Sequence, residues 1–296
     1  MPSFRNAKAQ AEHAVSQKLG IGKARHTNKG DHKIHSLGTA RNYAQALTRL
    51  THWIQENRLG DLKNLTSEVA RQYLEAEGQR IRQKALDQAR QAIQLQLGIT
   101  LPVIKSELTQ ARKSRAYTLE QIAAIVAAQT SKNSLSTKIA ATAGLRAHEL
   151  FTLRRIEERS ASGHRQWSTD RLIGREGKRY TVIGKGGLIR EVLIPHDLAE
   201  QLESKRLTLP AITEDRNIRY TQYYDISGGK NWSNSFSAAS KRTLKWSHGA
   251  HGVRHTFAQT RMEELQQRGF RYEAALGIVS QQMGHFRPSI TEVYLL

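Results

Sequence analysis

Three stretches of the sequence carry side chains that could act on a phosphate ester. Arg146 and Glu149 lie three residues apart in "GLRAHEL", and His251 and Arg254 have the same spacing in "HGVRHTFA". Residues three apart are neighbours on one helix face, so each stretch would present its pair together. Lys185 stands at the tip of the glycine-rich turn "GKGG". Each feature also has an ordinary explanation, a surface Arg–Glu pair or a solvated lysine, so only their combination is informative.

The C-terminal stretch "MGHFRPSITEVYLL" adds His285 and Tyr294, which are nine residues apart. At 3.6 residues per turn, one continuous helix would point these two side chains to opposite sides. Pro288 breaks the segment, and Ser289 with Glu292 has the spacing of a capping box. The sequence therefore predicts a new short helix that begins after the proline and carries Tyr294.

Ile290 and Val293 are predicted to anchor the apolar side of this short helix, with Tyr294 alongside. So short a helix is marginal by itself and depends on docking. Leu295 and Leu296 follow Tyr294. Because two residues span at most about 7 Å, they are too short to reach a neighbouring subunit. Either the C-terminus has been truncated, which the apolar ending favours, or subunits are linked by another segment, for which the basic arm of residues 1–35 is the best candidate.

The order of these motifs resembles that of the tyrosine recombinase (phage integrase) family. The matching pieces are "GLRAHEL", "GKGG", "HGVRHTFA", "MGH" and "TEVY", within residues 118–296, and the family's usual Leu is replaced by Met283. The resemblance implies catalytic residues at six positions: Arg146, Lys185, His251, Arg254, His285 and the nucleophile Tyr294.

The chemistry is consistent with this assignment. Attack on a phosphodiester builds negative charge on the non-bridging oxygens, which Arg146 and Arg254 would match in charge and geometry. The tyrosine hydroxyl, with a reference pKa of about 10, needs a proton acceptor, and His251 is the better candidate. Lys185 could protonate the departing 5′-oxygen. A 3′-phosphotyrosine link preserves the bond energy of the strand, so neither ATP nor another cofactor is expected.

A metal ion is not expected either. The sequence has no cluster of carboxylates suited to magnesium. His248, His251 and His255 have spacings that a metal could use, but no acidic or thiolate ligand lies nearby in the sequence. His255 is predicted to pack or to hydrogen-bond rather than to catalyse.

The charge of the chain favours a polyanionic partner. Lys and Arg total 46 against 26 Asp and Glu, a formal net charge of +20 over 296 residues. Double-stranded DNA is the leading candidate, and an anionic membrane surface is second. No apolar run could span a bilayer, and the N-terminus lacks the apolar core of a signal peptide. Without cysteine there are no disulfides, which fits a reducing interior such as the bacterial cytoplasm. There, a DNA partner implies association with the nucleoid.

Periodicity divides the chain into four segments. We expect a basic flexible arm at 1–35, where a short helix near Ala7–Lys18 is also compatible with the sequence, and a helical bundle at 36–100, which the family resemblance implies is a core-binding, DNA-binding domain. A linker at 101–117 and a catalytic domain at 118–296 follow. The predicted fold is mainly α. Its one clear exception is a β-hairpin around "GKGG", in a mixed α/β catalytic domain.

The resulting hypothesis is a site-specific DNA recombinase, the integrase of a mobile genetic element. It would act on double-stranded recombination sites and assemble on DNA as a tetramer. Accessory proteins that bend DNA or set the direction of the reaction are further candidate partners. Two alternatives stay open: a type IB topoisomerase-like nicking-closing enzyme, and a DNA-binding regulator whose catalytic set is a relic.

Overall fold

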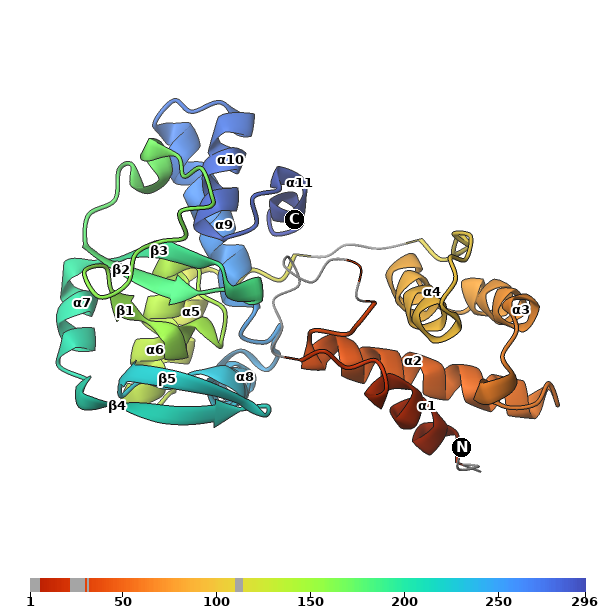
Figure 1. Ribbon diagram of the computed structural model, residues 1–296. Coiled ribbons are helices and arrows are strands. Elements are labelled where there is room, and N and C mark those ends of the chain that lie inside the picture. Colours follow the sequence, from red (N-terminus) through yellow and green to blue (C-terminus); the bar gives the residue numbers. More distant parts are fainter. Residues whose placement is uncertain (1–5, 22–29, 31, 110–113) are drawn as a thin grey trace. The chain divides into compact units, whose positions relative to one another are not determined.

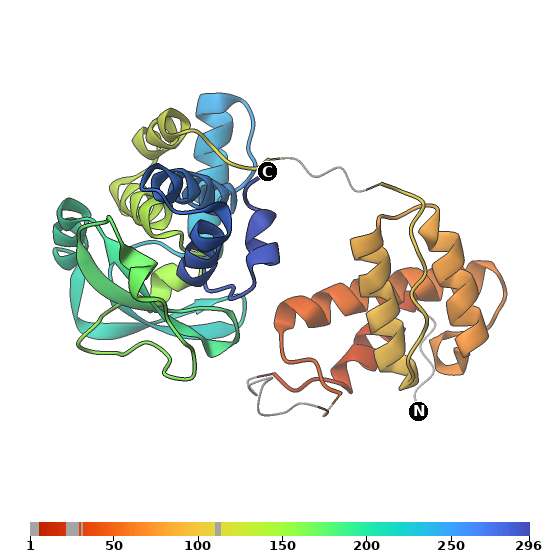
Figure 2. The ribbon, with the colours of Figure 1, turned by 90° about the horizontal axis from the view of Figure 1, so that it is seen from above.

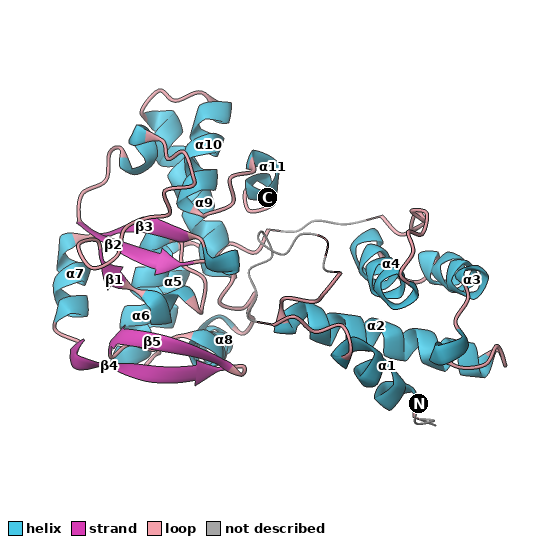
Figure 3. Ribbon diagram, in the orientation of Figure 1, coloured by secondary structure: helices cyan, strands magenta, loops and turns pink. Residues whose placement is uncertain are grey.

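The computed structural model describes residues 6–21, 30, 32–109 and 114–296. The chain divides into two compact units, Met1–Ala111 and Arg112–Leu296 (Figure 1). Among the described residues, helices dominate both units and the named strands occur in the second (Figure 3). The prediction of a mainly α fold with a mixed α/β C-terminal part is therefore confirmed. No described helix combines the length and the apolar character that crossing a bilayer requires.

The first unit is a helical bundle. It contains α1 (Ala7–Ser16), α2 (Leu37–Glu56), the short 3-10 helix η1 (Leu62–Asn64), α3 (Ser67–Gly78) and α4 (Gln83–Leu97). Helix α2 packs against α1, α3 and α4, which brings its apolar face into the centre of the bundle. The buried core consists mainly of Leu47, Leu50, Ile54, Tyr73, Leu74, Leu86 and Ile93.

The described part of the predicted N-terminal arm belongs to this bundle. Asn6 caps α1 by accepting hydrogen bonds from two backbone amides, and Ala11 and Val15 are buried in the core. The Gln10 side chain accepts a hydrogen bond from the backbone amide of Leu62 at 3.1 Å. The short helix that the sequence allows near Ala7–Lys18 is therefore present as α1, and its alanine-rich face packs on α2. Residues 1–5, 22–29 and 31 lie outside the described residues.

The segment predicted as a linker is also packed at both ends. Leu101 is part of the core of the first unit, and Tyr117 is part of the core of the second. Residues 110–113 lie outside the described residues. The compact units therefore extend into residues 101–117 from both sides.

A small antiparallel sheet forms the centre of the second unit. Strands β1 (Arg154–Arg155), β2 (Lys178–Ile183) and β3 (Ile189–Ile194) lie in the order β1-β2-β3. Strands β2 and β3 form the hairpin predicted around "GKGG". Their inward-facing residues, such as Val182 and Ile194, are buried against the surrounding helices.

Four helices enclose the core of this unit: α5 (Leu119–Ala127), α6 (Ser131–Ala143), α7 (His196–Glu203) and α8 (Gly229–Leu244). The predicted capping box of Thr118 and Gln121 is present at the start of α5. The core is contributed by Ile125, Ile139, Leu150, Val182, Ile194, Leu202, Trp232 and Phe236.

A second hairpin was not foreseen. Strands β4 (Arg206–Asp215) and β5 (Ile218–Tyr224) form a separate two-stranded antiparallel sheet. Leu209 and Ile212 on β4 are largely exposed, at 79% and 67%. The expectation of a single β exception was therefore wrong, because these strands bury too little apolar surface to show a clear inside–outside alternation.

The C-terminal helices form their own layer. Helices α9 (Gly252–Gln267) and α10 (Tyr272–Gln282) pack together, and the short α11 (Pro288–Glu292) follows, close to α10 (Figure 2). A separate apolar cluster, which includes Phe257 and Leu276, holds α9 and α10 together. This layer presents the motifs that contain His251 and His285.

Candidate active site

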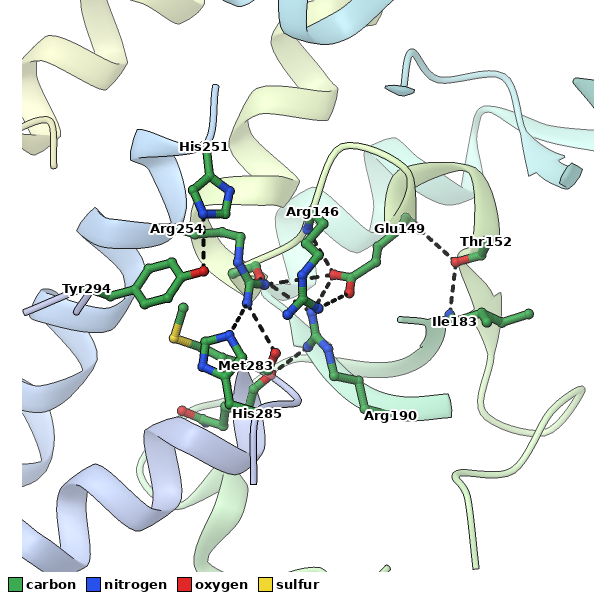
Figure 4. Close-up of polar contacts among 12 residues, drawn as sticks. Arg146, Glu149, Thr152, Ile183, Arg190, His251, Arg254, Met283, His285 and Tyr294 are labelled. Carbon is green, nitrogen blue, oxygen red and sulfur yellow. Dashed lines mark hydrogen bonds and ion pairs between the residues drawn. The ribbon is translucent and has the colours of Figure 1, made fainter. Parts of the chain in front are cut away.

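Five of the six predicted catalytic side chains converge in the second unit (Figure 4). Arg146 follows α6, His251 and Arg254 lie at the start of α9, and His285 and Tyr294 flank α11. Arg146 lies more than a hundred residues before the other four, which come from the two ends of the α9–α11 segment, so tertiary packing brings them together.

The Arg146–Glu149 pair forms the base of the site. The Glu149 carboxylate accepts hydrogen bonds from the Arg146 backbone amide at 2.8 Å and from Arg146 Nη1 at 2.7 Å. Glu149 begins the 3-10 helix η2 (Glu149–Thr152) and is fully buried, whereas 20% of the Arg146 side chain is exposed. The surface-pair explanation is therefore wrong: the carboxylate is internal and orients an arginine that still faces outward.

Glu149 also neutralises two further guanidinium groups. Arg190 Nη2 lies 2.7 Å from its carboxylate, and Arg254 Nη1 lies 3.9 Å away. Burial by itself would raise the pKa of the Glu149 carboxyl, but Arg190, Arg146 and Arg254 outweigh it and hold that pKa well below its ordinary value. Glu149 is therefore ionised, as the buried counter-charge of three arginines.

Arg254 is held rigidly inside the protein. Its guanidinium donates to the backbone carbonyls of Gly144 and of Met283, the latter at 3.1 Å, and to His285 Nε2 at 3.3 Å. Burial, followed by the charge of Arg146, lowers the pKa of Arg254 to about 9. The group still carries its proton at neutral pH, so it is a fixed positive charge that needs little rearrangement to meet an anion.

The position of His285 follows from the way α10 ends. The amide of Gly284 donates to the Gln281 carbonyl at 2.9 Å, and the amide of His285 donates to the Ser280 carbonyl at 2.9 Å. These two bonds make a Schellman motif, which requires a left-handed residue, and Gly284 supplies it with φ +69°. The "MGH" motif is thus a helix stop that turns the histidine back toward α9.

The hydrogen bonds of His285 assign its tautomer. Arg254 can only donate, so Nε2 accepts, and Nδ1 carries the proton that it donates to Thr291 Oγ1 at 3.0 Å. Burial, together with the charges of Arg254 and Arg146, lowers the pKa of His285 to about 3. His285 is therefore neutral at physiological pH.

Helix α11 docks differently from the prediction. Ile290 and Val293 are 42% and 40% exposed, whereas Thr291 is fully buried beneath His285. Arg287 occupies the N-cap position, and no side chain caps the helix. The apolar anchoring and the capping box were therefore wrong, because the hydrogen bond to His285 turns the polar Thr291 inward.

Tyr294 lies in a cage of histidines. Its hydroxyl is 3.1 Å from His251 Nε2, and its ring centroid is 4.6 Å from that of His255 and 5.1 Å from that of His285. The Arg254 guanidinium carbon lies 5.8 Å from the centre of the same ring. The side chain is half-buried, so the hydroxyl lies between the protein and solvent.

Both histidines of α9 are held neutral. Partial burial, together with the charge of Arg254, lowers the pKa of His251 to about 4 although its ring is exposed on one side. Burial and the charge of Arg115 lower the pKa of His255 to about 4. Among the described atoms, Nδ1 of His255 has no hydrogen-bond partner. Its packing on Tyr294 agrees with the packing role predicted for it.

Lys185 is the one predicted residue that does not contact the others. It is exposed in the turn Lys185–Gly187, and it takes part in none of the hydrogen bonds or ion pairs found among the described residues. The turn is nevertheless attached to the site. Thr152 Oγ1 accepts a hydrogen bond from the Ile183 amide at 2.9 Å, and a Cβ on Gly184 would lie 3.2 Å from Glu149 Oε1. Lys185 therefore follows directly after Gly184, the residue of the turn that lies against Glu149.

Arg190 was missed by the sequence analysis, and Glu149 was noted but not assigned to the site. Arg190 lies on the inward face of β3 together with Val192 and Ile194, where it is 1% exposed. A charged residue at an inward strand position was the signal that could have identified it. Among the described residues, no group of three or more His, Asp or Glu side chains is arranged to hold a metal ion.

Comparison with known proteins rests on the structure. No protein-family model matches the sequence, and no curated protein has significant sequence similarity to it. The chain does superpose on a solved XerH site-specific recombinase bound to palindromic difH substrate in a post-cleavage complex. The TM-score is 0.60 at 14% identity, over 98% of this chain and 90% of XerH. This chain has the tyrosine recombinase fold.

Two further structures show the same fold. A pre-cleavage complex of XerH with difH substrate gives a TM-score of 0.56 at 15% identity, over 99% of this chain and 94% of the other. A lambda integrase tetramer bound to a Holliday junction gives 0.52 at 14% identity, over 97% and 76%. The tyrosine recombinase fold therefore extends over nearly the whole chain.

Proposed function

We propose that this chain is a site-specific DNA recombinase that cuts and rejoins DNA through a covalent 3′-phosphotyrosine intermediate. The observation that carries the proposal is the position of the Tyr294 hydroxyl, 3.1 Å from His251 Nε2 and beside Arg254. A nucleophile needs a proton acceptor within hydrogen-bond reach and a positive charge near the reacting phosphate. The surroundings of Tyr294 meet both requirements.

In the cleavage step, the Tyr294 oxygen forms a bond to the scissile phosphorus while its proton passes to His251 Nε2. The bond from phosphorus to the 5′-oxygen breaks, and Lys185 supplies the proton that this oxygen needs. The products are a 3′-phosphotyrosine and a free 5′-hydroxyl. Rejoining reverses the step with the 5′-hydroxyl of a partner strand, so the reaction draws on neither ATP nor a metal ion.

Arg146 and Arg254 would both stabilise the negative charge that develops on the phosphate, but different contacts hold them in place. Arg254 is immobilised by backbone carbonyls and His285, so its charge is preorganised. Arg146 is held through one nitrogen by Glu149 and is partly exposed, which leaves the rest of its guanidinium for an incoming phosphate. Charge developing on the two non-bridging oxygens would thus meet one rigid donor and one accessible donor.

The substrate in this proposal is double-stranded DNA. The formal net charge of +20 favours a polyanion, and the solved XerH and lambda integrase structures of the same fold contain DNA substrates or a Holliday junction. By analogy with the lambda integrase tetramer, we propose assembly of four subunits on DNA. Integration of a mobile element, with accessory DNA-bending or directionality proteins, is the biological setting that we favour.

A nicked suicide DNA substrate tests the proposal. Loss of the short fragment at the nick traps any covalent complex, and Tyr294→Phe is the matched control because it removes one hydroxyl and keeps the ring. We expect an adduct with the natural protein, none with the variant, and equal binding by both. Strand exchange between two sites identifies a recombinase, and supercoil relaxation without exchange identifies a topoisomerase-like enzyme. Binding without any adduct identifies a regulator and contradicts the proposal.

A further inference from the structure

Phe286, directly after His285, has an unusual backbone conformation. Its φ is +53°, in the left-handed region that side chains with a Cβ rarely adopt. The chain leaves this residue through Arg287 into α11, whose first residue is Pro288. The direction in which α11 departs from the site therefore depends on a backbone angle that needs support from elsewhere.

The support is an aromatic contact with a distant loop. The Phe286 ring packs edge-on against Trp167, with centroids 4.8 Å apart and planes at 63°. Arg165 lies over the Phe286 ring at 5.1 Å, and Arg171 lies over the Trp167 ring at 4.6 Å. We call the Trp167–Phe286 pair the aromatic clasp. Its edge-to-face geometry and flanking cations are favourable for aromatic rings.

Trp167 is itself fixed. Its indole nitrogen donates to the Ser162 carbonyl at 3.0 Å, and Ser162 exchanges backbone and side-chain hydrogen bonds with Ile189 on β3. The next residue, Ser168, donates its backbone amide to the Gln281 side chain on α10 at 2.7 Å. The loop between β1 and β2 is thus tied to both β3 and α10, and it presents Trp167 as a rigid surface to Phe286.

The other contacts of the segment lie mostly at its end, where Tyr294 and Leu295 pack against the apolar cluster of α9 and α10 and Gln259 donates to the Leu296 carbonyl at 2.9 Å. Thr291 is bonded to His285, and the Tyr294 carbonyl accepts a hydrogen bond from Gln259 at 3.2 Å. Ile290 and Val293 face solvent and add little burial. Because α11 itself has little apolar anchoring, the direction that the chain takes at Phe286 influences where α11 lies and how the tyrosine after it meets His251.

We propose that Trp167 is a positioning residue for Tyr294. The Trp167 ring holds Phe286 in its left-handed conformation, and this conformation directs α11 so that the Tyr294 hydroxyl meets His251. The inference rests on the proposed function, because it assigns Trp167 a part in presenting the nucleophile. It adds the loop between β1 and β2, which carries none of the motif residues, to the machinery of cleavage.

The test compares Trp167→Ala with Trp167→Phe, which keeps an aromatic ring. Tyr272→Ala is the matched control, since Tyr272 is an aromatic residue of α10 with 43% exposure. Two quantities are measured: the single-turnover rate of adduct formation on the nicked substrate, and the affinity for the same DNA. A displacement of about 1 Å at a reacting group can cost on the order of a hundredfold in rate. We therefore expect Trp167→Ala to slow adduct formation at least about tenfold with little change in affinity.

The other variants sharpen the test. Trp167→Phe should recover most of the rate, and Tyr272→Ala should leave it unchanged. Phe286→Gly should be slow by itself, since it removes the second ring of the clasp. Combined with Trp167→Ala it should add little further loss, because both changes break the same contact. Equal slowing by Tyr272→Ala, or a Trp167→Ala rate close to that of the natural protein, would overturn the proposal.

A readout without catalysis separates this inference from the proposed function. Hydrogen–deuterium exchange of residues 287–296 in the DNA-free protein should be faster in Trp167→Ala than in the natural protein. If the natural protein forms no adduct, the proposed function fails, and the exchange comparison alone still decides whether the clasp orders α11. Unchanged exchange overturns the inference. A loss of DNA affinity in proportion to the loss of rate also overturns it, since Trp167 would then act on DNA directly.

Discussion

His251 Nε2 lies 3.1 Å from the hydroxyl oxygen of Tyr294 within one chain. The same tyrosine ring lies beside Arg254 and His285 of that chain. The proposed nucleophile and the groups that would activate it therefore belong to the same subunit. This arrangement predicts that the nucleophile acts in cis, within the subunit that supplies its proton acceptor.

Cleavage in cis is the first prediction. A mixture of Tyr294→Phe and Arg254→Ala proteins should form no adduct, since neither protein holds a complete site and neither can lend its missing group to the other. The measurement is covalent complex on the nicked substrate, with each variant alone as the control. Adduct formed by the mixture but by neither variant alone would mean that the tyrosine attacks in a neighbouring subunit's site.

The two arginines should differ in their effect on stability. Arg146→Ala and Arg254→Ala should each slow cleavage about a hundredfold or more while DNA binding persists, because each removes charge from the transition state. Arg254 is fully buried and bonds two backbone carbonyls, so its loss should also lower the free energy of unfolding. Arg146 is partly exposed, and without it Glu149 keeps Arg190 as its counter-charge, so its loss should lower stability less than the loss of Arg254. Urea unfolding of both variants checks this contrast.

Glu149→Gln should be strongly destabilising. The variant keeps the size of the side chain and removes the negative charge that neutralises Arg146, Arg190 and Arg254. Breaking a buried ion pair by removing one partner costs about 3–5 kcal/mol. The change in the free energy of unfolding measures this cost. Glu68→Gln on α3, where the carboxylate is exposed, is a control that should leave stability nearly unchanged.

Stability should fall as the pH drops below the ordinary histidine range. The pKa of His255 is lowered to about 4 and that of His285 to about 3, so the unfolded chain binds protons that the folded protein does not. Stability is therefore intact above about pH 6.5 and is lost progressively toward pH 4, by at most about 1.4 kcal/mol per pH unit for each group. Urea unfolding across this range measures the slope. A His255→Gln variant should have a shallower one.

DNA affinity should depend steeply on salt. Neutralising several phosphates releases counterions, so the logarithm of the binding constant should fall linearly with the logarithm of the salt concentration. Titrations of one DNA site at several salt concentrations measure this slope. Cleavage should meanwhile persist when magnesium is chelated. A binding constant that is insensitive to salt would contradict the inference, drawn from the net charge of +20, that the partner is DNA.

Local features of the site were determined by the sequence alone. The glycine pattern specifies the β2–β3 hairpin and places Lys185 in its turn, and the capping box at Thr118 starts α5 as predicted. The order of the motif residues indicated the tyrosine recombinase fold. These features depend on contacts between residues close in the chain, which periodicity and turn chemistry report directly.

Only the tertiary structure decided how these residues meet. Glu149 looked like half of a surface pair, yet it is buried because β3 brings Arg190 to it from 41 residues away. Thr291, and not Ile290 or Val293, faces inward on α11, because His285 offers a hydrogen bond at that point. Burial and charge compensation depend on which elements pack together across long separations, and no local pattern in the sequence encodes that pairing.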